Sequence, residues 1–218
     1  MGESEMLSEI LVYSLLLPGY ILLLLIVTLM VLSAFNKFKH SKYKFGKNHE
    51  PFISLIVPAH NEEEVIERTI KGFLKAKYNK NKKEMVIVND GSTDETRKIV
   101  EKYASVIINS ETNKIRKINK TFGRIVLVNR SKGGNGKAYV SNDGAKYARG
   151  DILFFIDADV EIKKNIFVKS ARHFSNPKVG AVAGYVQVRR NKNFLNGFIF
   201  FESLVAQKIV RAGFNVLG

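Results

Sequence analysis

The sequence predicts an α/β fold, with a mainly parallel, Rossmann-like sheet that follows an N-terminal transmembrane helix in the chain. Three observations predict this class. Short apolar runs rich in β-branched residues alternate with segments of helical periodicity, which is typical of βαβ units. Polar motifs follow three of these runs directly, where the carboxyl ends of parallel strands form a binding edge. A long uncharged apolar stretch precedes all of them.

Composition limits the class of protein. Of the 218 residues, 45% are apolar, which is enough for a packed core and excludes global disorder. The absence of cysteine excludes disulfides and cysteine-bound zinc. The net charge of +15 suits nucleic acid, an anionic membrane surface or a phosphorylated small molecule, and composition alone does not choose among them.

The N-terminal segment predicts a membrane anchor. Residues 10–35 carry no charge and are long enough to cross a bilayer as a helix. The acidic start, with Glu3, Glu5 and Glu9, differs from the basic start of a cleaved signal peptide. Five lysines follow the span: Lys37, Lys39, Lys42, Lys44 and Lys47. The positive-inside rule then predicts a single-pass protein of the cell membrane, with its N-terminus outside, its remaining domain cytoplasmic and these lysines near anionic lipid.

We divide the chain into four parts. Residues 1–36 form the N-terminal segment, with the anchor at about residues 10–35, and residues 37–51 form a basic juxtamembrane linker. Residues 52–193 carry the α/β domain. Residues 194–218 predict an amphipathic, interfacial helix whose apolar face suits either the membrane surface or contact with a further domain.

The first elements of the α/β domain alternate regularly. Residues 52–57 predict a strand that Pro58 ends, and residues 85–88 predict a second strand. Each strand is followed by a helix-start pattern, with Asn61 and Ser92 as the capping residues.

The later elements are less regular. Two strands flank a basic stretch, residues 109–124, that we interpret as a surface insertion. The helix predicted at residues 137–148 has a face of small residues suited to close packing: Ala138, Ser141, Ala145 and Ala148. The other elements predicted are strands at residues 106–108, 125–128, 152–156 and 179–188, and helical segments from Ile166 and from Phe194.

Asp157 and Asp159 follow the strand predicted at residues 152–156. Residues two apart in an extended segment project to the same side, so both carboxylates can bind one hard cation such as Mg²⁺ or Mn²⁺. The alternative is that one carboxylate caps the next helix while the other faces water.

Two more motifs lie at the same predicted edge. Asp90 follows a strand directly, and its carboxylate can accept hydrogen bonds from a nucleobase or a ribose; the alternative is that it makes only turn bonds. Residues 131–137, SKGGNGK, open a helix, and their backbone amides suit an anion together with Lys132 or Lys137. The alternative for this loop is a flexible hairpin.

Together these motifs carry a resemblance. In order, VPAHNEEE, VNDGSTDET, KGGNGKA and GDILFFIDADV resemble the motifs of family 2 glycosyltransferases, over about Ser54 to Gly218. The resemblance implies the GT-A fold and inverting transfer from a nucleotide-sugar, for which we expect a UDP-sugar. The anchor and the stretch GYVQVRRNKNFLNGFIFFESLVAQ resemble the processive branch, which includes cellulose, chitin, hyaluronan and poly-N-acetylglucosamine synthases. This branch implies polysaccharide or glycolipid synthesis, with a glycan or lipid acceptor.

The resemblance also implies roles for individual residues. Glu62 would face the ribose, Asp90 would hold the base, and Asp159 would bind the metal at the diphosphate. His60 stands where the family often has tyrosine, which bears on base stacking. The implied donor-binding residues are Pro58, Ala59, His60, Glu62, Asp90, Gly133, Lys137 and Asp157, and the implied ligands of Mg²⁺ or Mn²⁺ are Asp159 and Asp157.

The general base of the family is missing from this sequence. Inverting transfer needs a group that takes the proton of the acceptor hydroxyl, and the family places an acidic residue and a QxxRW motif downstream. After Asp159 the only carboxylates are Glu161, which is too close to the metal motif, and Glu202, which resembles a glutamate before the acceptor half. We therefore expect a truncated, donor-binding half that transfers sugar poorly without a second polypeptide.

Three alternatives remain open. FFIDADVEI also fits the opening motif of haloacid dehalogenase-type phosphatases, with Asp157 as nucleophile, although this motif comes late in the chain. A non-catalytic donor-binding or membrane-tethered subunit of a synthase complex is the second. RNA binding is the third and weakest, because basic runs such as residues 114–124 are usually solvated.

Overall fold

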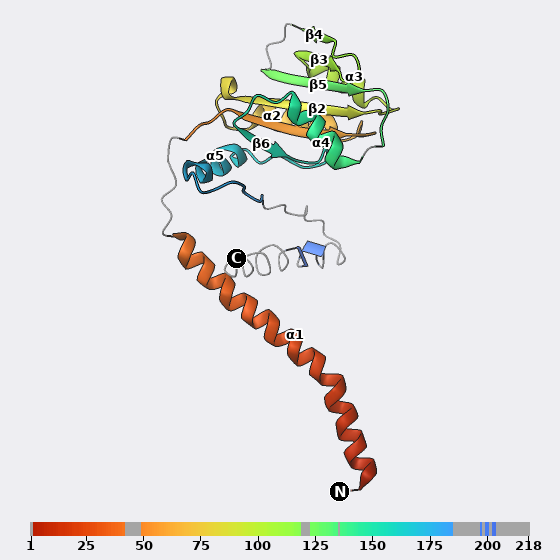
Figure 1. Ribbon diagram of the computed structural model, residues 1–218, viewed down its shortest axis with the longest axis vertical. Helices are drawn as coiled ribbons and strands as arrows, with labels where there is room; N and C mark the ends of the chain where they lie inside the picture. Colours follow the sequence, from red (N-terminus) through yellow and green to blue (C-terminus); the bar gives the residue numbers. More distant parts are fainter. Residues whose placement is uncertain are drawn as a thin grey trace. The chain divides into compact units, whose positions relative to one another are not determined.

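Figure 1 shows the computed structural model as a ribbon, with a long N-terminal helix and a domain of strands and helices. The strand predicted at residues 179–188 is described only as far as residue 184, and most of the helical segment after Phe194 lies outside the described residues. The structure describes residues 2–41, 49–118, 123–134, 136–184, 197, 199, 200, 202 and 203.

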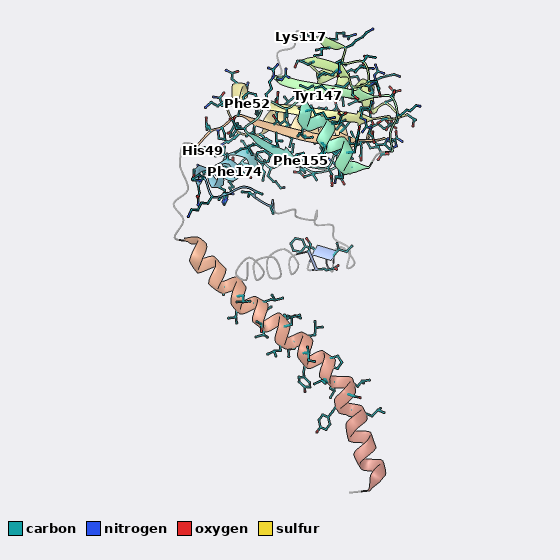
Figure 2. All side chains as sticks on the ribbon, viewed as in Figure 1. His49, Phe52, Lys117, Tyr147, Phe155 and Phe174 are labelled. Atoms are coloured by element: carbon teal, nitrogen blue, oxygen red, sulfur yellow. The ribbon has the colours of Figure 1, made fainter. Side chains whose placement is uncertain are left out.

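The N-terminal helix α1 (Glu3–Ser41) belongs to a compact unit of residues 1–44 and 183–218. Its stretch Leu11–Leu32 is the one part of the described chain that is long and apolar enough to cross a membrane as a helix. The large apolar side chains of this stretch project outward and are mostly about half exposed or more (Figure 2). The helix extends beyond the predicted anchor into the first residues of the predicted linker.

The second unit, residues 45–182, is built around a six-stranded sheet. Its strands are β1 (Ile53–Ala59), β2 (Lys83–Asp90), β3 (Val106–Asn109), β4 (Ile115–Lys117), β5 (Arg124–Arg130) and β6 (Ile152–Phe155). The strand order is β4-β3-β5-β2-β1-β6, and every neighbouring pair is parallel except β3 and β4. The predicted α/β class with a mainly parallel sheet is confirmed.

Helices cover both faces of this sheet. They are α2 (Ile66–Lys75), α3 (Thr96–Tyr103), α4 (Lys137–Lys146) and α5 (Ile166–Ala171), with the short 3₁₀ helices η1 (Lys80–Lys82) and η2 (Arg172–Ser175). On one face, α2, α3 and α5 share one core with the central strands, to which they contribute Phe73, Val100 and Phe167, respectively. On the other face, Val140 of α4 packs into a second core with Ile56 and its neighbours. Burial on both faces explains why β1 is almost continuously apolar and why the middle of β2, residues 85–88, is an unbroken apolar run.

Three strand predictions need correction. β1 continues through Pro58 to Ala59. Proline has no amide hydrogen, but no hydrogen bond of the sheet is lost at Pro58, because β6 pairs with β1 only as far as Ile56. The basic stretch predicted as an insertion contains β4, which closes the sheet by pairing antiparallel with β3. Residues 179–184 are not in a strand.

The buried face of α4 differs in part from the prediction. Val140, Asp143 and Gly144 are buried, whereas Ala138 is exposed. A Cβ atom built on Gly144 would lie 2.8 Å from a side-chain carbon of Ile56, so this glycine is what allows the helix to approach the sheet closely. Ala145 and Ala148 do pack against the second core, so the small-residue face is confirmed in part, but the closest contact with the sheet is made by Gly144.

Candidate functional site

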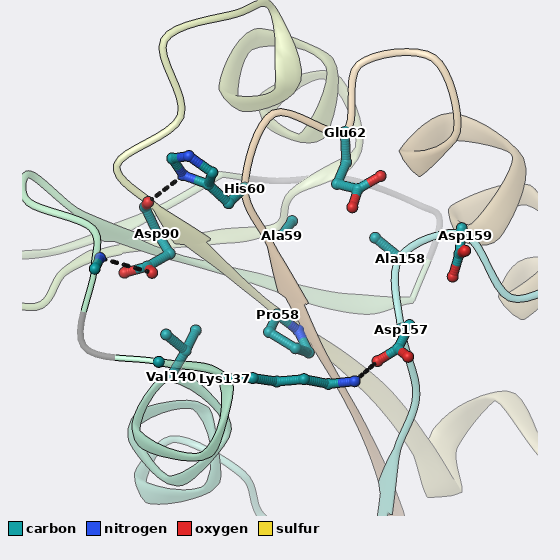
Figure 3. Close-up of a pocket in the computed structure, with 12 residues that line it drawn as sticks. Pro58, Ala59, His60, Glu62, Asp90, Lys137, Val140, Asp157, Ala158 and Asp159 are labelled. Atoms are coloured by element: carbon teal, nitrogen blue, oxygen red, sulfur yellow. Dashed lines mark hydrogen bonds and ion pairs between the residues drawn. The ribbon is translucent and has the colours of Figure 1, made fainter.

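A pocket of about 550 Å³ opens where β1, β2 and β6 end and α4 begins (Figure 3). This is the carboxyl edge of the parallel sheet, where ligands of open α/β folds bind. The lining residues are Pro58, Ala59, His60, Glu62, Asp90, Gly134, Gly136, Lys137, Val140, Asp157, Ala158 and Asp159. Four segments that are distant in sequence therefore meet around one cavity.

All predicted site residues except Gly133 line this pocket. Gly133 lies behind the wall: a Cβ atom built on it would lie 2.5 Å from the carbonyl oxygen of Asp90. Gly91 faces the same contact, since its Cβ would lie 2.6 Å from the nitrogen of Gly133. The two loops thus pack backbone against backbone, and Gly133 shapes the pocket without lining it. Sequence reasoning missed four lining residues, each close to a predicted one: Gly134, Gly136, Val140 and Ala158.

Asp90 is held at the end of β2 by contacts on several sides. Its Oδ1 atom lies 3.1 Å from Nη1 of Arg130, a nearly buried ion pair whose alignment is too poor for a hydrogen bond. The amide of Gly134 donates to Oδ2 of Asp90 at 3.4 Å, and Nδ1 of His60 lies 2.7 Å from the Asp90 carbonyl oxygen. Sequence reasoning missed Arg130, although its place at the end of a strand beside the glycine-rich loop was a signal. The register of β2 with β5 places it opposite Asp90.

The loops after β1 and β2 are joined by reciprocal hydrogen bonds. The Asn61 side chain accepts a bond from the Thr93 amide at 2.9 Å, and the Asn61 amide donates to the Ser92 hydroxyl at 3.0 Å. The Glu62 amide donates to the Thr96 hydroxyl at 2.7 Å. The predicted helix caps at Asn61 and Ser92 are therefore wrong, because α2 and α3 begin further along the chain without side-chain caps. The polar side chains bind the neighbouring loop instead and hold Glu62 at the pocket.

Asp157 and Asp159 do not lie in an extended segment, as the sequence reading assumed. β6 ends at Phe155, and the Val160 amide donates to the Asp157 carbonyl at 3.2 Å. This bond closes a β-turn in which Asp157 is the first residue and Asp159 the third. The turn still presents both carboxylates to the pocket, so the expected convergence holds for a different geometric reason.

Glu62 adds a third carboxylate to this side of the pocket. Burial raises the pKa of Glu62 above its ordinary value, and the negative charges of Asp159 and Asp157 raise the pKa further. The imidazole of His60 acts in the opposite direction. The potential at this wall is thus negative, which favours a cation between the carboxylates.

Lys137 brings positive charge to the same pocket. It is the first residue of α4 and follows Gly136, whose φ of 82° is in the left-handed region that favours glycine. Its Nζ atom forms an ion pair with Oδ1 of Asp157 (Figure 3). A lysine at a helix N-terminus, with free backbone amides beside it, suits a phosphate group.

The two aspartates fit a hard divalent cation by their chemistry. Both side chains are exposed and line one pocket, and their carboxylate oxygens are the ligands that Mg²⁺ and Mn²⁺ prefer. Within the described part of the chain, no group of three His, Asp or Glu side chains has the geometry to hold a metal ion alone. The protein would therefore supply two carboxylates and leave the other positions to water and phosphate oxygens.

The two later carboxylates do not complete the site. Glu161 does not line the pocket; its exposed side chain lies 3.6 Å from Nζ of Lys163. Glu202 belongs to the other compact unit. In the described residues around the pocket, therefore, no carboxylate downstream of Asp159 is placed to act as a general base.

Comparison with known proteins points to one family. The family model described as Glycosyl transferase family 2 matches residues 54–209. The chain is 29% identical over 174 residues to the probable glycosyltransferase YdaM of Bacillus subtilis (strain 168). This match covers 79% of this chain and 38% of that protein. It is 31% identical over 144 residues to the poly-beta-1,6-N-acetyl-D-glucosamine synthase of Staphylococcus aureus (strain COL), covering 66% of this chain and 30% of that protein.

A solved structure shares the fold. The mannosyltransferase PcManGT from Pyrobaculum calidifontis, in complex with GDP-Man and Mn²⁺, matches with a TM-score of 0.57 and 25% identity, over 78% of this chain and 45% of that chain. The chain spans about a third of the length of the two curated relatives named above.

Proposed function

The chain belongs to glycosyl transferase family 2, and from this premise we propose that it is the donor-binding part of a membrane-anchored, inverting glycosyltransferase. The donor is a nucleotide-sugar, bound with Mg²⁺ or Mn²⁺. The observation that carries the proposal is the pocket in Figure 3, where a carboxylate turn, a lysine at a helix N-terminus and a buried aspartate converge from distant parts of the chain. Family membership leaves the phosphatase alternative without support.

The pocket divides into two chemical halves. We assign the base to the side of His60 and Asp90, where backbone and side-chain contacts fix a buried carboxylate, and the ribose to Glu62, which lies between His60 and Asp159 (Figure 3). We assign the diphosphate to the side of Lys137 and the two aspartates, Asp157 and Asp159. A donor that spans the pocket in this direction would place its sugar beyond the aspartate turn.

The charges near the diphosphate suit departure of a nucleotide. When bound, the cation would neutralise negative charge on the leaving diphosphate. Lys137 would offset further charge there, and Asp157 and Asp159 would orient the cation. The proton of the acceptor hydroxyl must be taken by another group, because the described residues offer no such base beyond the turn.

A second candidate function follows from that last observation. Without a base, the chain would act as a non-catalytic donor-binding subunit of a synthase complex. In either case the proposal includes a glycan or lipid acceptor and a second polypeptide that supplies the acceptor-binding half. Steady turnover of donor by the purified 218-residue chain would favour the enzyme over the subunit.

We propose that α1 anchors the protein in the cell membrane through Leu11–Leu32. The five lysines that follow this stretch favour a cytoplasmic location for the rest of the chain and an outside N-terminus, by the positive-inside rule. A cytoplasmic pocket has direct access to nucleotide-sugars. Protease protection in sealed membrane vesicles tests this orientation.

Calorimetry tests donor binding directly. The full chain in detergent micelles is titrated with UDP, UDP-N-acetylglucosamine and GDP-mannose, with and without Mn²⁺. UDP-N-acetylglucosamine is chosen because the Staphylococcus relative is named as a synthase of poly-N-acetyl-D-glucosamine. GDP-mannose is chosen because PcManGT is in complex with GDP-Man. We expect UDP and UDP-N-acetylglucosamine to bind with Mn²⁺, and Asp159→Ala to abolish the Mn²⁺ dependence. Failure of every nucleotide to bind with Mn²⁺ would overturn the proposal.

A further inference from the structure

The hydroxyl group of Thr69 reaches from α2 to the middle of the aspartate motif. Its Oγ1 atom donates to the carbonyl oxygen of Ala158 at 2.5 Å. Both residues are almost fully buried, with exposed fractions of 1% for Thr69 and 2% for Ala158. Figure 3 shows Ala158 between the two aspartates, so this bond lies directly behind the turn that presents them.

The bonded carbonyl belongs to the central peptide of that turn. The turn runs from Asp157 to Val160, and its closing bond joins the Val160 amide to the Asp157 carbonyl. The central peptide of a β-turn can take two opposite orientations, which are the type I and type II forms. Rotation of this peptide would change the backbone angles of Ala158 and Asp159 and therefore the direction of the Asp159 carboxylate.

Thr69 is well placed to fix one orientation. It lies in α2, which is anchored in the core by Ile66, Ile70 and Phe73. A threonine hydroxyl in a helix often bonds a carbonyl of its own preceding turn, but here it is directed to a segment 89 residues away. The buried carbonyl of Ala158 would lose this hydrogen bond if the hydroxyl were removed.

We propose that Thr69 is a positioning residue that sets the geometry of Asp157 and Asp159 toward the cation of a bound nucleotide. This inference rests on the proposed function. Loss of the Thr69 hydroxyl weakens the Mn²⁺-dependent part of nucleotide binding, because the two carboxylates no longer hold one direction. The Mn²⁺-independent part is retained, because Asp90 on the base side is held by Arg130 and Gly134, which belong to β5 and the glycine-rich loop and not to this turn.

Two substitutions separate the hydroxyl from the shape of the side chain. Thr69→Val keeps the volume and removes the hydroxyl, whereas Thr69→Ser keeps the hydroxyl and removes a methyl group. The full chain in detergent micelles is titrated with UDP in the presence and absence of Mn²⁺, and melting curves confirm that each variant is folded. We expect Thr69→Val to weaken Mn²⁺-dependent binding about ten-fold and Thr69→Ser to stay within about two-fold of the wild type.

The outcomes distinguish this inference from the proposed function. Equal Mn²⁺-dependent affinity of wild type and Thr69→Val overturns the role of Thr69 and leaves the proposed function standing. Equal losses in both variants also overturn it, because they indicate packing of the methyl group rather than the hydrogen bond. A wild-type chain that binds none of UDP, UDP-N-acetylglucosamine and GDP-mannose with Mn²⁺ overturns both.

Discussion

Lys137 and Asp157 form an ion pair although one begins α4 and the other begins the turn after β6. Both side chains remain largely exposed, at 65% and 51%, so each is open to a ligand. A diphosphate would attract the lysine, and a divalent cation would attract the aspartate. Donor binding is therefore expected to exchange this internal pair for two contacts with the metal–diphosphate group.

The first prediction concerns the lysine of this pair. Lys137→Met removes a positive charge from the diphosphate side, and we expect UDP to bind about ten-fold more weakly in the presence of Mn²⁺. Uridine, which has no phosphate, should lose almost nothing. Lys132→Met is the matched control, since Lys132 is exposed on the same loop and does not line the pocket. Equal losses in the two variants would show a general charge effect rather than a contact of Lys137.

The second prediction concerns the contact between the two glycine loops. A methyl group at Gly133 would lie 2.5 Å from the Asp90 carbonyl oxygen, which is too close for any real carbon atom. Gly133→Ala should therefore displace Asp90 and weaken UDP binding at least ten-fold, with or without Mn²⁺. Gly180→Ala is the control, because a Cβ there meets nothing within 4 Å. Unchanged affinity for UDP in Gly133→Ala would refute the proposed role of this contact.

Sequence patterns predicted the binding edge because it depends on topology. Once βαβ units are recognised, the residues that follow parallel strands must meet at one edge. Asp90, Asp157 and the loop after β1 therefore meet without any knowledge of their detailed contacts. The glycine-rich loop joins them for the same reason, because it connects β5 with α4.

The missed features depend on contacts between distant segments. Asn61 looked like a helix cap because a cap and an inter-loop bond use the same side-chain oxygen, and only the fold decides between them. Thr69 sits within the apolar stripe of α2, where its pattern resembles any buried helix position. The turn at Asp157 was missed because one hydrogen bond to Val160 ends the extended geometry. None of these bonds has a local sequence signal.

The third prediction concerns Glu84, a fully buried carboxylate near the start of β2. The sequence pattern did not predict its burial. Its oxygens accept hydrogen bonds from the Ser54 hydroxyl at 2.6 Å, the Arg149 amide at 2.6 Å and Nε of Arg124 at 2.5 Å. Glu84→Gln keeps the shape but leaves the Arg124 guanidinium without its counter-charge. We expect the free energy of unfolding to fall by about 3 kcal/mol in chemical denaturation.

The control for this prediction is Glu95→Gln. Glu95 pairs with Lys98 at 2.7 Å, but its side chain is 58% exposed, so this pair should contribute less than about 1 kcal/mol. Similar losses in the two variants would mean that burial does not set the energy of the Glu84 network.

The fourth prediction concerns the pH dependence of stability through Glu62. The pKa of Glu62 lies above its ordinary value of 4.5, first because of burial and then because of the charges of Asp159 and Asp157. The stability contributed by a group with a raised pKa is complete below the unfolded pKa and is lost as pH rises through the folded pKa. At pH 7 the Glu62 charge therefore destabilises the ligand-free protein, and Glu62→Gln should raise its melting temperature.

The gain should be small, below about 1 kcal/mol, because Glu62 is only half-buried and solvent screens its charge. It should shrink as the pH falls toward 4, where Glu62 of the wild type becomes protonated. Melting curves between pH 4 and pH 8 measure this trend, with the exposed Glu64→Gln as control. In the same variant UDP should bind more weakly, because Glu62 is assigned to the ribose. A melting temperature that rises equally at pH 4 and pH 7 would show that the charge of Glu62 is not the cause.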